Sequence, residues 1–181
     1  GAFDFVEKPL SLAKLLRTVE GALESGGASA KKSRSMLPAL LTPVGRSELM
    51  KSLREKVQQY ARHDASVLLS GEPGTGRGAF ARYMHALSNR SEEPLTALTA
   101  ASLTDNNVEE QLLGSESGGS INAGAFERAG RGTLVIDELA DLNEKGQKIL
   151  IGVLEDGRFT RVGGTQPVRL EARIVATVSA D

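Results

Sequence analysis

Residues 66–78 read SVLLSGEPGTGRG, and this stretch sets the fold class. The short continuous apolar run at 66–70 is typical of a strand buried in a parallel sheet. A glycine-rich turn follows at 71–76, and a helix is expected over 77–88. Such a turn lets backbone N–H groups approach phosphate oxygens closely, and the helix N-terminus adds a favourable dipole. The stretch therefore predicts an α/β fold with a phosphate-binding turn.

The turn matches most of the phosphate-loop pattern G-x-x-x-x-G-K-[ST]. Both anchor glycines of the pattern are present, and Arg77 stands at the lysine position. Arg77 keeps the charge but replaces a compact ammonium with a planar fork. Gly78 stands at the Ser/Thr position. The predicted nucleotide-binding residues are Gly71, Glu72, Gly74, Thr75, Gly76, Arg77 and Gly78.

A second apolar run, TLVID at 133–137, ends in two carboxylates, Asp137 and Glu138. A carboxylate in this place holds Mg²⁺, usually through water, and its neighbour orients or deprotonates an attacking water. An apolar strand ending in Asp-Glu is weak evidence alone, but together with the glycine loop it indicates a nucleotide site. We therefore predict an ATP or ADP site with Mg²⁺. Asp137 is the predicted metal residue, and Asp137 and Glu138 are the predicted catalytic residues.

Helices and strands alternate through the rest of this part of the chain. Ser47 is expected to cap a helix, further strands are expected at 95–98 and 173–178, and a hairpin is expected over 157–171. Strands alternating with helices indicate βαβ units and a parallel sheet. The expected inward-facing residues are Leu49, Met50, Leu53, Val57 and Tyr60 on the first helix, and Gln147, Leu150, Val153 and Leu154 on the helix after Glu138.

The first forty residues have a different pattern. Residues 2–6 predict a short strand, and Ser11 is expected to cap a helix with leucine and valine at helical spacing. Residues 25–43 mix Gly, Ser, Ala, Lys and two prolines, which is the composition of a linker. The chain opens without Met in an apolar stretch, so we expect that it was cut from something longer.

The composition of the 181 residues narrows the class of protein. Lys plus Arg total 22 against 23 for Asp plus Glu, which argues against a dominant nucleic-acid surface. The chain has no cysteine and two histidines, which excludes disulfides and thiolate metal sites and disfavours a histidine-rich one. No apolar run is long enough to span a bilayer. A cytoplasmic protein with no membrane partner is therefore expected.

Three stretches resemble the NtrC family of response regulators, whose AAA+ domains remodel sigma-54 RNA polymerase. Residues 44–85, VGRSELMKSLREKVQQYARHDASVLLSGEPGTGRGAFARYMH, are similar to the opening of the AAA+ core. Residues 132–164, GTLVIDELADLNEKGQKILIGVLEDGRFTRVGG, match the strand with the paired carboxylates and the hairpin after it. Residues 1–16, GAFDFVEKPLSLAKLL, look like the last strand and helix of a receiver domain. An NtrX-like regulator is the subgroup that fits.

The resemblance implies a domain plan for the chain. Residues 1–24 are the C-terminal remnant of a receiver domain, 25–43 are a linker, and 44–181 are the N-terminal part of a truncated P-loop NTPase core of the AAA+ type. In this family the phospho-acceptor precedes such a start, and the arginine fingers, fifth core strand and DNA-binding domain follow such an end. The strand at 66–70 is therefore expected at an exposed sheet edge, where it invites pairing with another chain.

Several positions depart from the family pattern. Family members have Lys and Glu where this chain has Arg77 and Gly78, and Asn where it has Thr99. Residues 114–129, GSESGGSINAGAFERA, lack the GAFTGA tip that touches sigma-54, and Ser179 stands at the first sensor position. By resemblance these changes predict weak ATP binding, impaired hydrolysis and no standard sigma-54 activation.

Three functions stay open on the sequence. The first is a two-component transcriptional regulator with a working ATPase that assembles into an AAA+ ring, contacts sigma-54 RNA polymerase, and reaches DNA only through a missing C-terminal domain. The second is a degenerate module that binds nucleotide weakly or not at all and serves oligomerisation and signal relay. The third is an interaction domain that dimerises through the helix at 10–23. The substitutions favour the second, and the retained Asp137 and Glu138 keep the first open.

Overall fold

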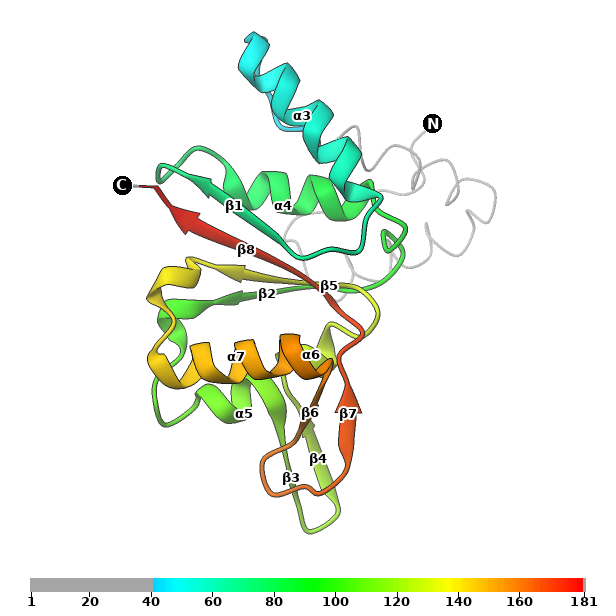
Figure 1. Ribbon diagram of the computed structural model, residues 1–181, viewed down its shortest axis with the longest axis vertical. Helices are drawn as coiled ribbons and strands as arrows, with labels where there is room; N and C mark the ends of the chain where they lie inside the picture. The colour runs from blue at the N-terminus through cyan, green and yellow to red at the C-terminus, as the bar shows by residue number, and fades with distance from the viewer. Residues whose placement is uncertain (1–40, 181) are drawn as a thin grey trace, which may run out of the picture. The chain divides into compact units, whose positions relative to one another are not determined.

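A computed structural model describes residues 41–180 of the chain (Figure 1). Four parallel strands form its central sheet: β1 (Val67–Gly71), β2 (Leu95–Thr99), β5 (Thr133–Asp137) and β8 (Arg173–Ser179). Their order in the sheet is β1-β8-β5-β2, so strands distant in the sequence lie side by side. The predicted α/β parallel-sheet fold is confirmed. The predicted receiver remnant, its helix at 10–23 and most of the predicted linker lie outside the described residues.

Helices cover both faces of this sheet (Figure 1). Helices α3 (Glu48–Ala61) and α4 (Arg77–Ala86) lie on one face, and α5 (Val108–Leu113), α6 (Ala125–Arg128) and α7 (Glu144–Asp156) lie on the other. Two short 3₁₀ turns, η1 (Ala100–Ser102) and η2 (Leu139–Asp141), follow strands β2 and β5. The carboxyl ends of the parallel strands therefore open into the loops that precede the next helices, which is where ligands bind in folds of this kind.

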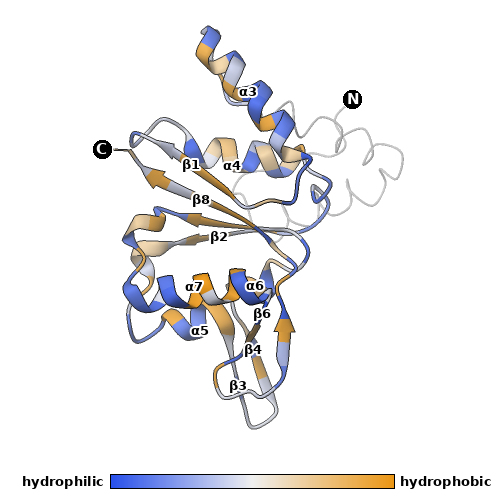
Figure 2. Cartoon of the chain, in the orientation of Figure 1, coloured by the Kyte–Doolittle hydropathy of each residue, from blue (hydrophilic) through white to orange (hydrophobic). Residues whose placement is uncertain are grey.

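The strand side chains divide between two hydrophobic clusters. Val135 and Val175 pack with α3 and α4, whereas Leu134, Ile136 and Ile174 pack with α5, α6 and α7. Successive side chains of a strand point to opposite faces, so a nearly continuous apolar run supplies both clusters. Figure 2 shows the apolar colour concentrated along the strands and the polar colour on the outer faces of the helices.

The helix cap predicted at Ser47 is confirmed, whereas the one predicted at Ser11 lies outside the described residues. The Ser47 hydroxyl accepts a hydrogen bond from the Met50 N–H at 3.3 Å and begins α3. The Asn143 side chain accepts one from the Gly146 N–H at 2.8 Å and begins α7. Helix α7 ends at Asp156 and is followed by Gly157, whose φ of 65° suits a residue without a side chain.

The predicted inward face of α3 is only partly correct. Val57 is buried and Met50 is partly buried, but Leu49 is 70% exposed, and Leu53 and Tyr60 are exposed as well. The N-terminal half of α3 extends past α4, as Figure 1 shows. The other end is anchored because the buried Arg173 side chain donates hydrogen bonds to three carbonyls at the end of this helix and just after it, those of Tyr60, Ala61 and Ala65.

The predicted inward face of α7 also needs correction. Leu150 and Val153 are buried as expected, but Gln147 and Leu154 are exposed, and Gly146 is buried in their place. A Cβ on Gly146 would lie 2.6 Å from the Leu142 side chain. The helix therefore approaches its neighbours closely at a glycine, so its contact stripe is rotated relative to the one that the larger apolar residues suggested.

Two hairpins project from one end of this part of the molecule (Figure 1). Strands β6 (Arg158–Thr160) and β7 (Pro167–Arg169) form the hairpin predicted over 157–171. Strands β3 (Gly114–Ser117) and β4 (Ser120–Ala123) form a second one, which the sequence analysis did not predict. Its two-residue turn is Gly118-Gly119, with φ of 57° and 81°, as hairpin turns of this length require.

Strand β1 is an edge strand of the described sheet, as predicted. Leu68 on this strand is 57% exposed, although it lies in the apolar run that suggested full burial.

Within residues 41–180, none of the helices combines the length and apolarity that crossing a membrane requires.

Candidate nucleotide site

The predicted phosphate loop forms the turn between β1 and α4. Gly74 and Gly76 have φ of 83° and 89°, a conformation that L side chains rarely adopt. The Thr75 N–H and hydroxyl both bond to the Glu72 carbonyl, at 3.2 and 2.7 Å, which closes the turn. Helix α4 begins at Arg77, and the first N–H groups of a helix lack acceptors within it. The loop thus presents backbone donors and a helix N-terminus at the carboxyl end of the sheet.

Arg77 does not point into open solvent. Its guanidinium donates to both carboxylate oxygens of Glu138, Nη2 to Oε1 at 2.5 Å and Nη1 to Oε2 at 3.1 Å. The side chains are 10% and 30% exposed, respectively. A planar fork matched to a carboxylate in this way is among the stronger ion pairs that proteins form. The structure therefore brings together two predicted site residues, but it pairs them with each other.

Ser179 joins the same cluster from the end of β8. Its N–H and hydroxyl both donate to Glu138 Oε2, at 3.1 and 3.2 Å. Its hydroxyl oxygen also lies 3.2 Å from Arg77 Nη1, which donates to it. The Glu138 carboxylate thus has four donors around it. The position named as the first sensor from the sequence contacts both charged residues of the site.

The backbone at Glu138 is strained. Its φ of 52° is the only positive value among the non-glycine residues that the structure describes. A left-handed conformation costs such a residue about 1–2 kcal/mol. The Glu138 N–H donates to the Thr177 hydroxyl at 3.0 Å, which helps to hold the turn. Strain of this kind persists only where the surroundings enforce it, and it concentrates at functional sites.

Thr177 is a site residue that the sequence analysis missed. It is fully buried on β8, and its hydroxyl donates to Asp137 Oδ1 while it accepts from Glu138 N–H. One hydroxyl therefore orients both carboxylate residues at the end of β5. The available signal was a threonine within the otherwise apolar run IVATV at 174–178.

Asp137 lines a small cavity next to the start of α4. The cavity has a volume of about 160 Å³, and Gly78, Arg82 and Thr99 also line it. Thr99 lies beside Asp137 in the β2–β5 register, and the hydrogen bonds of Glu138 run to Arg77 and Ser179 instead. No group of three or more His, Cys, Asp or Glu side chains suited to a metal occurs among residues 41–180. Any Mg²⁺ here would take most of its ligands from phosphate and water.

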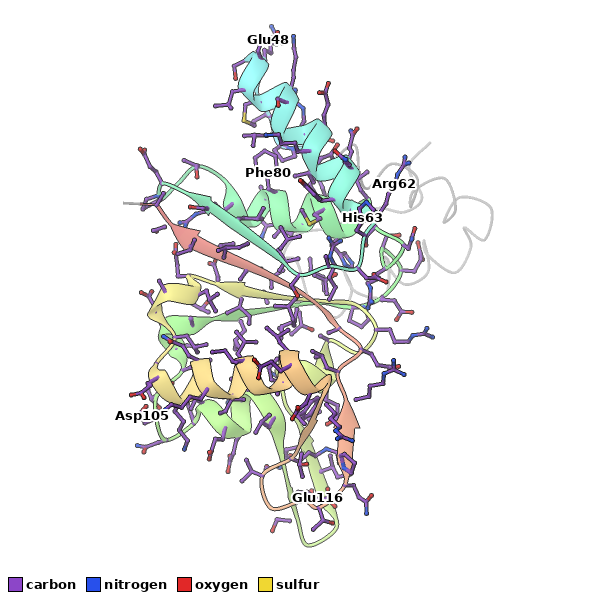
Figure 3. The ribbon with its side chains drawn as sticks, viewed as in Figure 1. Glu48, Arg62, His63, Phe80, Asp105 and Glu116 are labelled. Atoms are coloured by element: carbon purple, nitrogen blue, oxygen red, sulfur yellow. The ribbon has the colours of Figure 1, made fainter. Side chains whose placement is uncertain are left out.

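A larger, mainly apolar cavity adjoins the phosphate loop on the α3 side. Its volume is about 580 Å³, within the range of small-molecule sites. Gly71, Thr75 and Arg77 form its polar end. Figure 3 shows Phe80 rising from α4 toward α3. The apolar part is lined by Leu49, Met50, Leu53, Leu68, Leu69 and Phe80. The exposed leucines of α3 and β1 therefore face a cavity that leads to the predicted phosphate site.

A second ionic cluster ties the two hairpins together. The Arg161 guanidinium donates to both oxygens of Glu127 at 2.7 and 2.9 Å and to Glu116 at 3.2 Å. Hydrogen bonds from Arg161 hold the pKa of the Glu127 carboxyl below its usual value. The Glu116 N–H also donates to the Val162 carbonyl at 2.8 Å, and Figure 3 places Glu116 on the β3–β4 hairpin. The β3–β4 hairpin is thus held against the β6–β7 segment by an ion pair and a backbone hydrogen bond.

Known proteins resemble this chain along its whole length. The model of the sigma-54 interaction domain matches residues 43–181. The DNA-binding transcriptional regulator NtrC of Azospirillum brasilense is 34% identical over 192 residues, which cover 100% of this chain and 39% of that protein. Crystal structures of NtrX from Brucella abortus superpose with TM-scores of 0.75 for the complex with ADP and 0.74 for the complex with ATP.

Both NtrX structures are covered completely on the side of this chain, at 33% and 34% identity, and to 41% and 39% of their own length. The chain thus spans about two fifths of the length of these relatives. The sheet order, the strand–loop–helix turn and the paired carboxylates after β5 agree with this likeness. The chain belongs to the NtrC family of sigma-54 activators, and residues 43–181 are its sigma-54 interaction domain.

Proposed function

We propose that this domain binds ATP or ADP, with the phosphates on the 71–78 loop and the base and ribose in the adjoining cavity of about 580 Å³. The proposal depends on one observation, that the phosphate loop and the cavity adjoin. Gly71, Thr75 and Arg77 belong both to the loop and to the cavity lining. A polar end with backbone donors and an apolar end suit a nucleotide. The relatives solved with ADP and ATP support the same ligand class.

Each predicted site residue has a role in this proposal. The backbone of Gly71, Gly74, Gly76 and Gly78 approaches the phosphates, Glu72 and Thr75 close the turn, and Arg77 supplies the charge. Asp137 holds Mg²⁺ through water, and Glu138 is the residue in place to orient an attacking water. Gly78 brings no hydroxyl to the metal, so the metal site is poorer than the phosphate-loop pattern provides.

We further propose that hydrolysis is impaired. A base has to be within hydrogen-bond reach of the water that it activates. The Glu138 oxygens are instead occupied by donors from Arg77 and Ser179. The module then acts in a transcriptional response regulator as a nucleotide-binding and oligomerisation element. Glu138 can act only after the nucleotide has drawn Arg77 away, and Gly78 brings no hydroxyl to the metal, so both features favour this over a working ATPase.

We also propose that residues 1–24 belong to the C-terminal end of a receiver domain, that residues 25–43 are a linker, and that the domain self-associates. The β3–β4 hairpin ends in Ser117-Gly118-Gly119-Ser120, which offers little apolar surface to a partner, so we propose no standard sigma-54 contact there.

Titration calorimetry with ADP and ATP tests nucleotide binding. We expect the chain to bind both in the micromolar range, and Arg77→Ala to weaken binding at least tenfold because the phosphates lose their cation. Arg158→Ala removes an exposed arginine from the start of β6 and is expected to leave binding unchanged. Absence of binding by the unaltered chain contradicts the proposal, as does equal binding by Arg77→Ala.

A further inference from the structure

The contacts of Arg77 bear on how nucleotide binding at this site is regulated. In this structure its guanidinium gives both ends of its fork to Glu138 and donates to the Ser179 hydroxyl. Arg77 is also the first residue of α4 and lines the polar end of the cavity at the phosphate loop. The one cation at the centre of the predicted phosphate site is therefore already bound to a carboxylate.

A phosphate group and a carboxylate compete for the same kind of contact. Each can accept two parallel hydrogen bonds from the planar arginine fork through two of its oxygens, and each gains most from such a bidentate pair. A guanidinium that is only 10% exposed has little freedom to serve both at once. A phosphate arriving at the loop must therefore draw Arg77 away from Glu138.

Glu138 is poised to move when Arg77 leaves. Its backbone is in the left-handed region, and its carboxylate contacts are part of what holds it there. It immediately precedes η2, which packs against β8 and leads into α7. A change at this residue is therefore transmitted to the segment that connects the site to the second helical layer.

We propose that Arg77 is a two-position latch that reports nucleotide occupancy. Without nucleotide it binds Glu138 and Ser179 and keeps the turn at Glu138 closed. A bound polyphosphate then pairs with the Arg77 guanidinium. Glu138 loses its charged partner as a result, and the Ser179 N–H loses its acceptor. The inference rests on the proposed nucleotide binding, and it explains weak binding by internal competition instead of by a defective loop. Arg77 contacts the polyphosphate itself, and Ser179 is a positioning residue that acts through Glu138 and Arg77.

Calorimetry with ADP separates competition from a defective loop, and ADP avoids turnover. Glu138→Gln keeps the size of the side chain but removes the competing charge, so we expect about tenfold tighter ADP binding. Asp141→Asn removes one charge from the exposed end of η2 and is the matched control, expected to bind as the unaltered chain does. Equal or weaker binding by Glu138→Gln overturns the latch.

Amide hydrogen exchange supplies a readout that affinity alone does not give. The Ser179 N–H donates to Glu138 Oε2 at 3.1 Å, and the next amide, Ala180 N–H, donates to the Gly71 carbonyl at 3.1 Å. With saturating ADP we expect exchange of the Ser179 amide to accelerate several-fold while the Ala180 amide is unchanged or slower. Unchanged or slower exchange at Ser179 in the ADP complex overturns the latch.

Different results would rule out the proposed nucleotide site and the proposed latch. If the unaltered chain binds ADP but Glu138→Gln binds no tighter, the nucleotide site stands and the latch is wrong. If the unaltered chain, Glu138→Gln and Arg77→Lys all fail to bind, the nucleotide site is wrong and the latch falls with it.

Discussion

The Arg77 guanidinium spans both carboxylate oxygens of Glu138, a residue 61 positions later in the chain. The pair links the first turn of α4 to the end of β5 across the carboxyl edge of the sheet. In the unmodified phosphate-loop pattern a lysine stands at position 77, and a compact ammonium does not form such a fork. One substitution therefore changes both the cation of the loop and the availability of the carboxylate opposite it.

The proposed impairment of hydrolysis predicts that Glu138 contributes little to ATP turnover in the unaltered chain. With saturating ATP the chain and its Glu138→Gln variant should release phosphate at rates within twofold of each other, because Gly78 brings no hydroxyl to the metal and turnover is poor whether or not the carboxylate is free. A phosphate-release assay with Mg²⁺ measures this. A rate that falls tenfold or more on replacing Glu138 would show that this carboxylate still activates water in the ATP complex, which contradicts impaired hydrolysis.

Replacing either of two glycines by alanine is expected to change the free energy of unfolding, in opposite directions at the two positions. A Cβ on Gly132 would lie 1.8 Å from the Pro94 carbonyl oxygen, so Gly132→Ala should lower the free energy of unfolding by about 1–3 kcal/mol. Gly152, within α7, has no atom within 4 Å of a built Cβ, and Gly152→Ala should raise it by about 0.5–1 kcal/mol. Urea unfolding of both variants measures the difference. Equal effects would mean that the approach of Gly132 to Pro94 is wrong.

His85 predicts a pH dependence of stability. Burial lowers its pKa below the usual value, and its Nδ1 lies 2.9 Å from the Thr133 hydroxyl. The unfolded chain then binds a proton at about pH 6.5 while the folded chain does not, so stability is complete above that pH and declines as the pH falls below it. One proton gives a slope of at most about 1.4 kcal/mol per pH unit.

Thermal unfolding at pH 7.5 and 5.5 checks this dependence. We expect the unaltered chain to lose stability between these values and His85→Gln to lose less. His63→Gln, in the exposed turn after α3, is the matched control and should behave as the unaltered chain does. The carboxyl groups with lowered pKa, Asp64 and Glu127, titrate below this window. The same pH response in His85→Gln and the unaltered chain would contradict the assignment.

The exposed edge at β1 predicts self-association that depends on this strand. Leu68 is 57% exposed, so Leu68→Lys should change the free energy of unfolding by no more than about 0.5 kcal/mol. A lysine on an edge strand opposes pairing with another strand. Sedimentation velocity over a concentration series should show association of the chain and its loss in Leu68→Lys. Ile121→Lys, on exposed β4, is the control, and loss of association there as well would exclude a role specific to β1.

The sequence predicted the parallel sheet and the phosphate loop because both follow from local patterns. An apolar run before GEPGTGRG requires a strand and a turn whichever residues lie elsewhere. The Arg77–Glu138 pair depends on which side chains meet at one edge of the sheet, and no local pattern encodes that meeting. Thr177 was missed for the same reason, since its role depends on the register that places it beside Asp137 and Glu138.

Helical periodicity predicted roughly which side of α3 and of α7 faces inward, but not how far the contacts of each helix extend. Leu49 has the correct spacing for the inner face, yet α3 extends past the sheet there and Leu49 lines the cavity instead. In α7 a buried glycine lets the helix come close and moves Leu154 outward. The β3–β4 hairpin has little apolar alternation, and the Arg161 ion pairs with Glu116 and Glu127 hold it in place.

Titration of the chain and of Arg77→Lys with ADP in the presence of Mg²⁺ tests the central claim that the 71–78 loop is a nucleotide site. We expect micromolar binding by the chain and tighter binding by Arg77→Lys, because lysine does not hold both oxygens of Glu138. Absence of binding by both proteins would contradict the account, since the fold would then be a scaffold without this ligand.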